Sequence, residues 1–191
     1  MYPSIFLSYG GINMSINSAL IHHHETLYRE YINNHRTNVQ RAWNLMKNNP
    51  ECLEYIEKTI INSNIDAIID CVDTLINNHD LSKFGPEEFD AGRKNFYPVS
   101  PEEREENLVN YDKAWVHHYT NNMHHWNWWD ESNNEDKMPF IYVIEMICDW
   151  EAMGYHFGNN SKKWYEKEKG NIHLGTEQRI FAEGLMNIIC K

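Results

Sequence analysis

Apolar side chains recur along most of the chain at the three- and four-residue spacing of an amphipathic helix. One such stripe runs from about Ser18 to Lys47, and its inward positions are Tyr28, Ile32, His35, Val39, Trp43 and Met46. Because His35 belongs to this stripe, its imidazole is expected on the buried face. The sequence therefore predicts a long first helix that turns one histidine toward the core.

A second stripe ends on another histidine. A short helix is predicted from Pro50, because proline favours the first helical turn. The stripe of the next helix consists of Ile65, Ile68, Ile69, Val72, Leu75 and Ile76. One more step of the same spacing reaches His79, which is therefore expected to point inward at the end of its helix.

Three later segments also have helical spacing, after an FGPEEF turn and a proline-bounded loop. Helices are expected from about Glu103 to Tyr119, from Pro139 and from Thr176. In the second of these, Asp149 shares a face with apolar residues one turn away, which puts a carboxylate among apolar neighbours. No segment has a convincing strand period, so the predicted class is all-α, a single-domain helical bundle.

Composition agrees with one folded domain. The 191 residues are 41% hydrophobic and include seven tryptophans, enough for one core. No repeat or linker divides the chain, so we expect a helical domain over residues 18–191 and an N-terminal extension over residues 1–17. The four cysteines form no CxxC pair, and neither a basic leader nor a membrane-length apolar stretch is present. These features predict a cytoplasmic protein with no membrane partner.

The charge of the chain restricts its partners. A formal net charge of −11 opposes binding to duplex nucleic acid, which needs clustered lysines and arginines. A small phosphorylated substrate stays compatible with this charge, because a bound metal ion locally reverses the field of an acidic protein.

Ionisable side chains on predicted inward faces point to a metal site. His35, His79 and Asp149 lie on three separate predicted helices, and Asp80 follows His79 directly. Burial of such groups costs free energy unless they are paired. A divalent transition metal (Mn, Fe, Zn, Ni or Co), as one ion or two, would pair all four at once. The alternatives are a helix cap, a hydrogen-bonded core histidine and a buried ion pair.

This order of ligands resembles the HD-domain metal-dependent phosphohydrolase superfamily, with His35, His79, Asp80 and Asp149 at the matching positions. The HDLSK stretch is similar to an HDxGK variant of the motif, although Ser82 replaces the glycine. A downstream GYP signature is missing, so the cyclic-dinucleotide subclass is not implied. The resemblance implies a hydrolase in which a metal-activated water attacks a nucleotide or another small phosphoester.

A closer resemblance is to an uncharacterised family of bacterial and phage proteins that carry HDLSKF, AWxHH, HHWxxW and MICDW motifs. It covers about residues 20–157 and implies no established activity. Two other functions therefore stay open: an HD-fold di-iron oxygenase, and a non-catalytic protein that binds a ligand on the same scaffold.

Further residues are candidates for catalysis beside the metal ligands. Asp80 could orient the attacking water, and Lys83, one turn away, could reach a phosphoryl oxygen and stabilise developing charge. The alternative for Lys83 is a solvated surface lysine. The tryptophans between Trp126 and Trp129 could stack on a base or sugar, but core packing is the preferred interpretation.

Two histidine pairs lie seven residues apart. His118 and His125 share a helical stripe and are expected to line the pocket, where they could hold phosphate or a second metal ion. His117 and His124 are the second choice for this role. The alternative is a polar and aromatic core cluster.

We predict that His79→Ala and Asp80→Ala each abolish metal retention but leave most of the helicity, because these ligands lie at a helix end. Elemental analysis and circular dichroism measure the two quantities. Metal content at the wild-type level in both variants would contradict the site.

Overall fold

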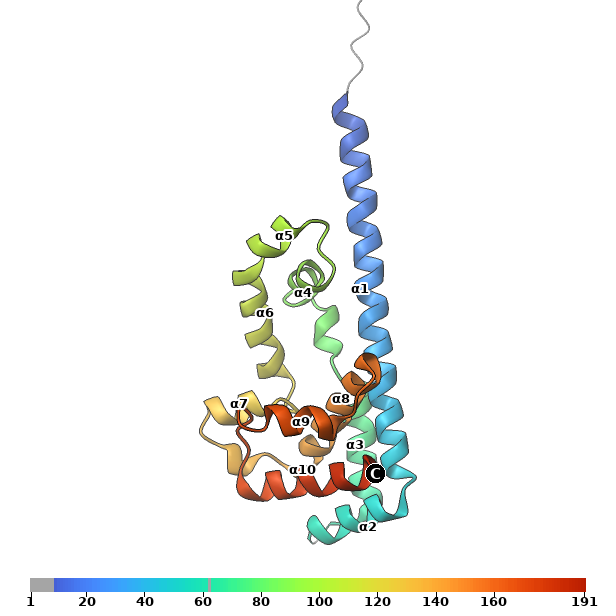
Figure 1. Cartoon of the computed structure of the whole chain (residues 1–191), viewed down its shortest axis with the longest axis vertical. Coiled ribbons are helices and arrows are strands. Elements are labelled where there is room, and N and C mark those ends of the chain that lie inside the picture. Colours follow the sequence, from blue (N-terminus) through green and yellow to red (C-terminus); the bar gives the residue numbers. More distant parts are fainter. Residues whose placement is uncertain (1–8, 62) are drawn as a thin grey trace, which may run out of the picture.

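The longest element is α1 (Tyr9–Lys47), whose N-terminal part projects beyond the other helices in Figure 1. The computed structural model describes residues 9–61 and 63–191, and within these ranges it contains ten α-helices, two short 3-10 helices and no strand. The remaining elements are α2 (Pro50–Thr59), α3 (Ile65–Asn78), η1 (Leu81–Phe84), α4 (Phe89–Phe96), α5 (Pro101–Glu106), α6 (Leu108–Asn121), α7 (Trp126–Glu131), η2 (Glu135–Lys137), α8 (Phe140–Phe157), α9 (Ser161–Glu168) and α10 (Thr176–Ile189). The predicted all-α class is confirmed.

Helix α8 lies at the centre of the core. It is apolar on most of its circumference, as expected for a helix that neighbours surround, and it packs against α1, α3, α9 and α10. This apolar unit is completed by α2, α3, α9, α10 and the lower part of α1. A second group, α4, α5 and α6, lies beside the middle part of α1 (Figure 1). No helix within residues 9–61 and 63–191 is long and apolar enough to cross a membrane.

The first predicted helix ends at Lys47 as expected but begins earlier, at Tyr9. The predicted boundary between residues 17 and 18 therefore lies inside α1. Residues 1–8 of the predicted extension lie outside the described residues. The helices predicted from Pro50, Pro139 and Thr176 are confirmed as α2, α8 and α10.

The helix predicted from Glu103 to Tyr119 is wrong in one respect, since Asn107 divides this segment into α5 and α6. The buried Asn107 amide donates a hydrogen bond to the Ala91 carbonyl at 2.8 Å, which holds the junction against α4. Helix α4 itself occupies part of the predicted loop. Its Arg93 is buried and forms a two-pronged ion pair with Glu103 of α5, an interaction between elements that no local pattern reveals.

A tight contact joins α8 to α9. The buried Glu151 carboxylate accepts hydrogen bonds from the backbone nitrogen and the hydroxyl of Ser161, at 2.8 and 2.7 Å, at the start of α9. A Cβ atom on Gly154 would lie 2.8 Å from the Asn160 Cα and 2.9 Å from the Asn159 carbonyl oxygen. Glycine at this position therefore lets the loop return close to α8.

We predict that Gly154→Ala lowers the free energy of unfolding by about 1 to 3 kcal/mol, the range for overpacking against atoms that cannot easily move. Urea denaturation measures this change. The control is Gly170→Ala, because a Cβ there has open space and should change stability by less than about 0.5 kcal/mol. Equal stabilities of the two variants would contradict the steric argument.

Candidate metal centre

Four side chains from three helices and one turn meet at the first half of the centre. His35 comes from α1, His79 caps the C-terminus of α3, Asp80 follows it, and Asp149 comes from α8. The His35 Nε2 atom lies 3.0 Å from Asp149 Oδ1, 3.5 Å from Asp80 Oδ2 and 3.3 Å from His79 Nε2. His79 Nε2 lies 3.5 Å from the same Asp80 oxygen. The ligand atoms of His35, His79 and Asp80 all lie within 4.8 Å of one another. Asp149 adjoins this group through His35 and through His79 Nε2, which lies 3.9 Å from Asp149 Oδ1.

The backbone conformation of Asp80 explains how its carboxylate reaches the centre. Asp80 has φ 56° and ψ 20°, a left-handed conformation that aspartate adopts more readily than most residues. This conformation ends α3 directly after His79 and begins η1. As a result, the side chain is 1% exposed and its carboxylate lies between two groups of histidines.

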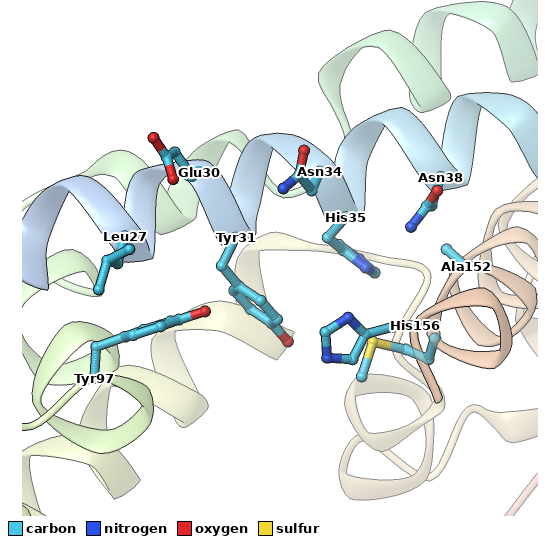
Figure 2. A pocket seen from close by; sticks show the side chains of 10 residues that line it. Leu27, Glu30, Tyr31, Asn34, His35, Asn38, Tyr97, Ala152 and His156 are labelled. Carbon is cyan, nitrogen blue, oxygen red and sulfur yellow. The ribbon is translucent and has the colours of Figure 1, made fainter. Parts of the chain in front are cut away.

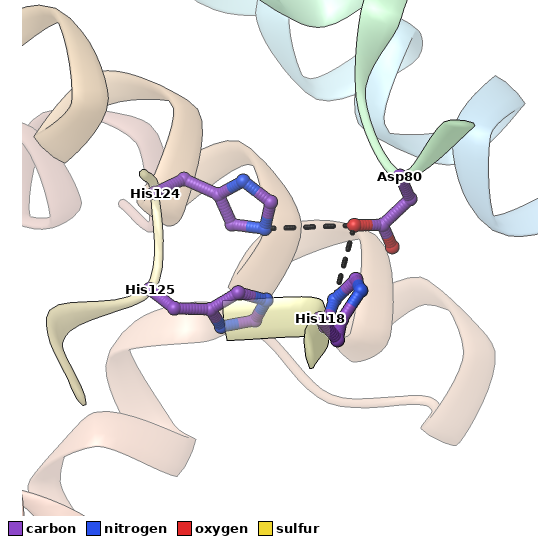
Figure 3. A group of neighbouring side chains, drawn as sticks. All are labelled: Asp80, His118, His124 and His125. Atoms are coloured by element: carbon purple, nitrogen blue, oxygen red, sulfur yellow. Dashed lines mark ion pairs between the residues drawn. The ribbon is translucent and has the colours of Figure 1, made fainter. Parts of the chain in front are cut away.

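The second half of the centre lies at the other oxygen of Asp80. Asp80 Oδ1 is 3.3 Å from His118 Nε2 and 3.7 Å from His124 Nε2, and the His125 ring lies beside them (Figure 3). One ligand atom from each of these four residues falls within 4.8 Å of the others. Asp80 Oδ1 and the three imidazole Nε2 atoms are buried and make no hydrogen bond within the described part of the chain. Four such atoms facing one another match the donor set of a bound cation.

Two glutamates orient the histidines from behind. Glu145 Oε1 accepts a hydrogen bond from His79 Nδ1 at 2.9 Å and lies 3.2 Å from His124 Nδ1. Glu88 Oε2 accepts from His118 Nδ1 at 2.8 Å. A proton held on Nδ1 leaves the Nε2 lone pair of a neutral imidazole free for a metal ion. The residues present therefore fit one or two divalent transition metals.

The ionisation of the carboxylates suits the same role. Burial raises the pKa of Asp149, but the hydrogen bond and charge of His35 hold this pKa well below its usual value. The pKa of Asp80 is also lowered, because the neighbouring His79 and Lys83 charges outweigh burial. For Glu145, hydrogen bonds from His124 and His79 outweigh burial and lower the pKa to about 2. All three groups are ionised near neutral pH, as metal ligands and their supports need to be.

Lys83 lies at the edge of the centre. Its Nζ atom donates a hydrogen bond to Asp80 Oδ2 at 2.6 Å, and its side chain is 25% exposed. Burial lowers the pKa of Lys83, but the charges of Asp80 and Asp149 raise it above its ordinary value, so the amine is cationic. The structure thus places Lys83 beside the metal ligands, and the solvated-surface alternative does not describe it.

The structure groups the four histidines between residues 117 and 125 in a way that matches neither predicted pair. Helix α6 ends at Asn121, so the chain turns back and brings both His124 and His125 to the centre beside His118. His117 is half-exposed and bonds instead to Glu88 Oε1 at 2.8 Å, outside the cluster. The second-choice pairing of His117 with His124 is therefore corrected: the structure brings only His124 to the centre.

Sequence reasoning missed both supporting glutamates. Glu145 lies four residues before Asp149 in the apolar α8 segment, so a second acid on the Asp149 face was a usable signal. Glu88 lies in the FGPEEF turn, and nothing in its local sequence marks it as a histidine partner. Trp126 and Trp129 pack against the core as preferred, and the Trp129 indole donates to the Met123 carbonyl at 2.9 Å.

Two cavities adjoin His35. The larger, about 250 Å³, is walled by Tyr28, Tyr31, Phe96, Tyr111 and Trp115 and has Lys83, His118, His125 and Asp149 among its other lining residues. We call it the tyrosine cavity. The smaller, about 150 Å³, also borders Tyr31 and has the polar residues Asn34, Asn38 and His156 in its lining (Figure 2). An aromatic cavity therefore borders the candidate metal centre.

Comparison with known proteins adds a family to this geometry. The model of the DUF5662 family, a family of unknown function, matches residues 18–191. The chain belongs to this family. No curated protein and no solved structure gave a match. The DUF5662 assignment therefore covers the whole metal centre and names no activity for it.

We predict that Glu145→Leu weakens metal binding by about 10- to 100-fold, the usual cost of removing a group that orients metal-binding histidines. Glu145→Gln should lose less, because its amide oxygen can still accept hydrogen bonds from both histidines although it lacks the negative charge. Metal titration followed by calorimetry measures the affinity. Glu177→Leu, at an exposed acid of α10, is the control. Wild-type affinity in Glu145→Leu would show that the histidines need no such support.

Proposed function

We propose that this protein is a metal-dependent phosphohydrolase that acts on a nucleotide or another small phosphoester. The observation that carries the proposal is the Asp80 carboxylate, whose two oxygens face two separate groups of metal-binding side chains. Enzymes that displace groups at phosphorus often use two metal ions held by a shared ligand. A lysine beside the same carboxylate adds the positive charge that such a reaction needs.

The proposed roles follow from the contacts. His35, His79, Asp80 and Asp149 would hold one divalent cation, and Asp80, His118, His124 and His125 would hold a second. Such cations polarise a phosphoryl oxygen and activate the attacking water molecule. Asp80 fixes the spacing of the two half-sites and orients the water.

Other residues of the tyrosine cavity would bind the phosphoester. Lys83 offers a cation to a phosphoryl oxygen that develops charge during the reaction. Burial raises the pKa of Tyr31 and of Tyr111, so both hydroxyls stay protonated. Neither hydroxyl makes a hydrogen bond with another group in the described ranges, which leaves both free to donate to substrate oxygens.

Elemental analysis of the purified protein, together with a screen of divalent metals against phosphoesters, tests the proposal. Phosphate release that depends on Mn, Fe, Co, Ni or Zn is the expected result. Two bound irons with oxygen-dependent turnover and no hydrolysis would instead establish a di-iron oxygenase. A protein that retains no metal would be a non-catalytic binder. The nitrogen and oxygen donors suit each of these metals, so the assay decides between the functions.

We predict that Lys83→Met lowers kcat by about 10²- to 10³-fold, the effect of removing one group that stabilises charge in the transition state. Metal content should stay at the wild-type level, because Lys83 is not a ligand. Steady-state kinetics and elemental analysis measure the two quantities. Lys113→Met, at an exposed position of α6, is the matched control. Equal kcat in both variants would exclude Lys83 from the reaction.

A further inference from the structure

A second large cavity reaches the metal centre from another direction. It has a volume of about 350 Å³, and its walls include the four tryptophans Trp115, Trp126, Trp150 and Trp164. We call it the tryptophan cavity. Helices α7, α8 and α9 contribute most of it, whereas α1, α4 and α6 surround the tyrosine cavity. In Figure 1, α4 and α6 lie above α7 and α9.

The two cavities meet at the metal centre. Their linings share four residues, Trp115, His125, Asp149 and Met153. Asp149 belongs to the first half of the centre and His125 to the second. A ligand whose reacting group lies at the centre is therefore adjacent to both cavities.

The linings carry little positive charge. Lys83 is the one lysine or arginine among the residues that line the two cavities, and it is already paired with Asp80. The tryptophan cavity has no lysine or arginine among its lining residues and carries Glu168 at its wall. A chain of phosphates would find no partner there, whereas an uncharged aromatic ring would find indole faces on which to stack.

The apolar wall continues past the tryptophan cavity. An adjoining cavity of about 300 Å³ is lined by Trp150, Met153, Gly154, Phe157, Asn159 and Trp164. Phe157 is 70% exposed and Trp164 is 38% exposed, so aromatic surface stays open to a ligand beside the more deeply buried Trp150. Indole and phenyl groups that line a cavity are typical of a binding site for an organic group.

We propose that the tryptophan cavity is a second substrate subsite, which binds an uncharged aromatic group, and that the substrate is a phosphodiester with its other organic group in the tyrosine cavity. This inference rests on the proposed phosphohydrolase function. A phosphomonoester has an organic group on one side of phosphorus only and would leave one of the two cavities unused. A phosphodiester has an organic group on each side of phosphorus. It also carries a single negative charge, in agreement with Lys83 as the single lysine of the two linings.

The reaction balances with water as the second reactant. An oxygen–phosphorus bond forms from water, and one phosphorus–oxygen ester bond breaks. The departing oxygen leaves as an alcohol or phenol with one proton of the water, and a phosphomonoester remains. No oxidant, reductant or further reactant is needed.

Three chromogenic esters test the inference with metal-loaded protein: bis(4-nitrophenyl) phosphate, methyl 4-nitrophenyl phosphate and 4-nitrophenyl phosphate. We expect kcat/KM to be highest for the first, which offers a ring to each cavity, and lowest for the monoester. Trp164→Ala should lower the ratio of kcat/KM between the first two esters by about tenfold, the effect of losing one aromatic stacking contact. Trp128→Ala is the matched control, because Trp128 lines neither cavity.

A binding measurement separates recognition from turnover. Calorimetry compares the dissociation constants of diphenyl phosphate and methyl phenyl phosphate in the wild type, Trp164→Ala and Trp128→Ala. We expect the diphenyl ester to bind more tightly, with an advantage that Trp164→Ala loses and Trp128→Ala retains. Circular dichroism of the partly exposed Trp164 variant checks that it is folded.

The outcomes distinguish this inference from the function on which it rests. Hydrolysis of the monoester at least as efficiently as both diesters, with an unchanged ratio in Trp164→Ala, would overturn the second subsite and leave the phosphohydrolase intact. Hydrolysis of none of the three esters with Mn, Fe, Co, Ni or Zn would contradict the proposed function. In that case calorimetry tests the second subsite by itself. Tighter binding of diphenyl phosphate than of methyl phenyl phosphate, lost in Trp164→Ala, supports the subsite. Equal binding of the two esters to the wild type overturns it.

Discussion

The buried Asp80 carboxylate is the group on which the rest of the centre depends. Burying an isolated ionised carboxylate costs several kcal/mol, so its neighbours must supply positive charge and hydrogen bonds. Lys83, His35 and His79 do this for one oxygen. The other oxygen faces imidazole nitrogens yet makes no hydrogen bond in the described part of the chain. Asp80 Oδ2 therefore has partners within the chain, whereas Asp80 Oδ1 has none in the described residues. A cation bound beside Oδ1 would supply the missing partner.

The scaffold around Asp80 is rigid where the ligands are attached. His35 and Asp149 lie inside the packed pair α1 and α8, and His79 caps a helix whose other end packs on the same core. Sites built on packed helices hold their geometry more tightly than sites on loops. The three imidazoles of the second half come from the end of α6 and the turn after it. There Glu88 holds the His118 ring and Glu145 holds the His124 ring, whereas helix packing holds the side chains of the first half.

Much of this architecture could be predicted because a single helix carries its own signal. The stripe through α1 predicted an inward His35, the stripe through α3 predicted an inward His79, and both are buried. The break at Asn107 and the position of α4 could not be predicted, because they depend on contacts of Asn107 and Arg93 with residues of other helices. Likewise, the Asn-Asn step at the end of α6 indicated a turn but not its direction, which brings both His124 and His125 to the centre.

The overall charge of the protein connects the two proposed binding events, that of a metal ion and that of an anionic substrate. The chain has a formal net charge of −11, and the centre contains the carboxylates of Asp80, Glu88, Glu145 and Asp149 around one lysine. An anion that approaches this region without a divalent cation meets a field of its own sign. A cation bound among these carboxylates reverses the local field. Each ligand should then strengthen binding of the other, since linkage between two sites is reciprocal. The proposed preference for an anion of low charge agrees with this arrangement, because the walls beyond the centre offer aromatic rings rather than further cations.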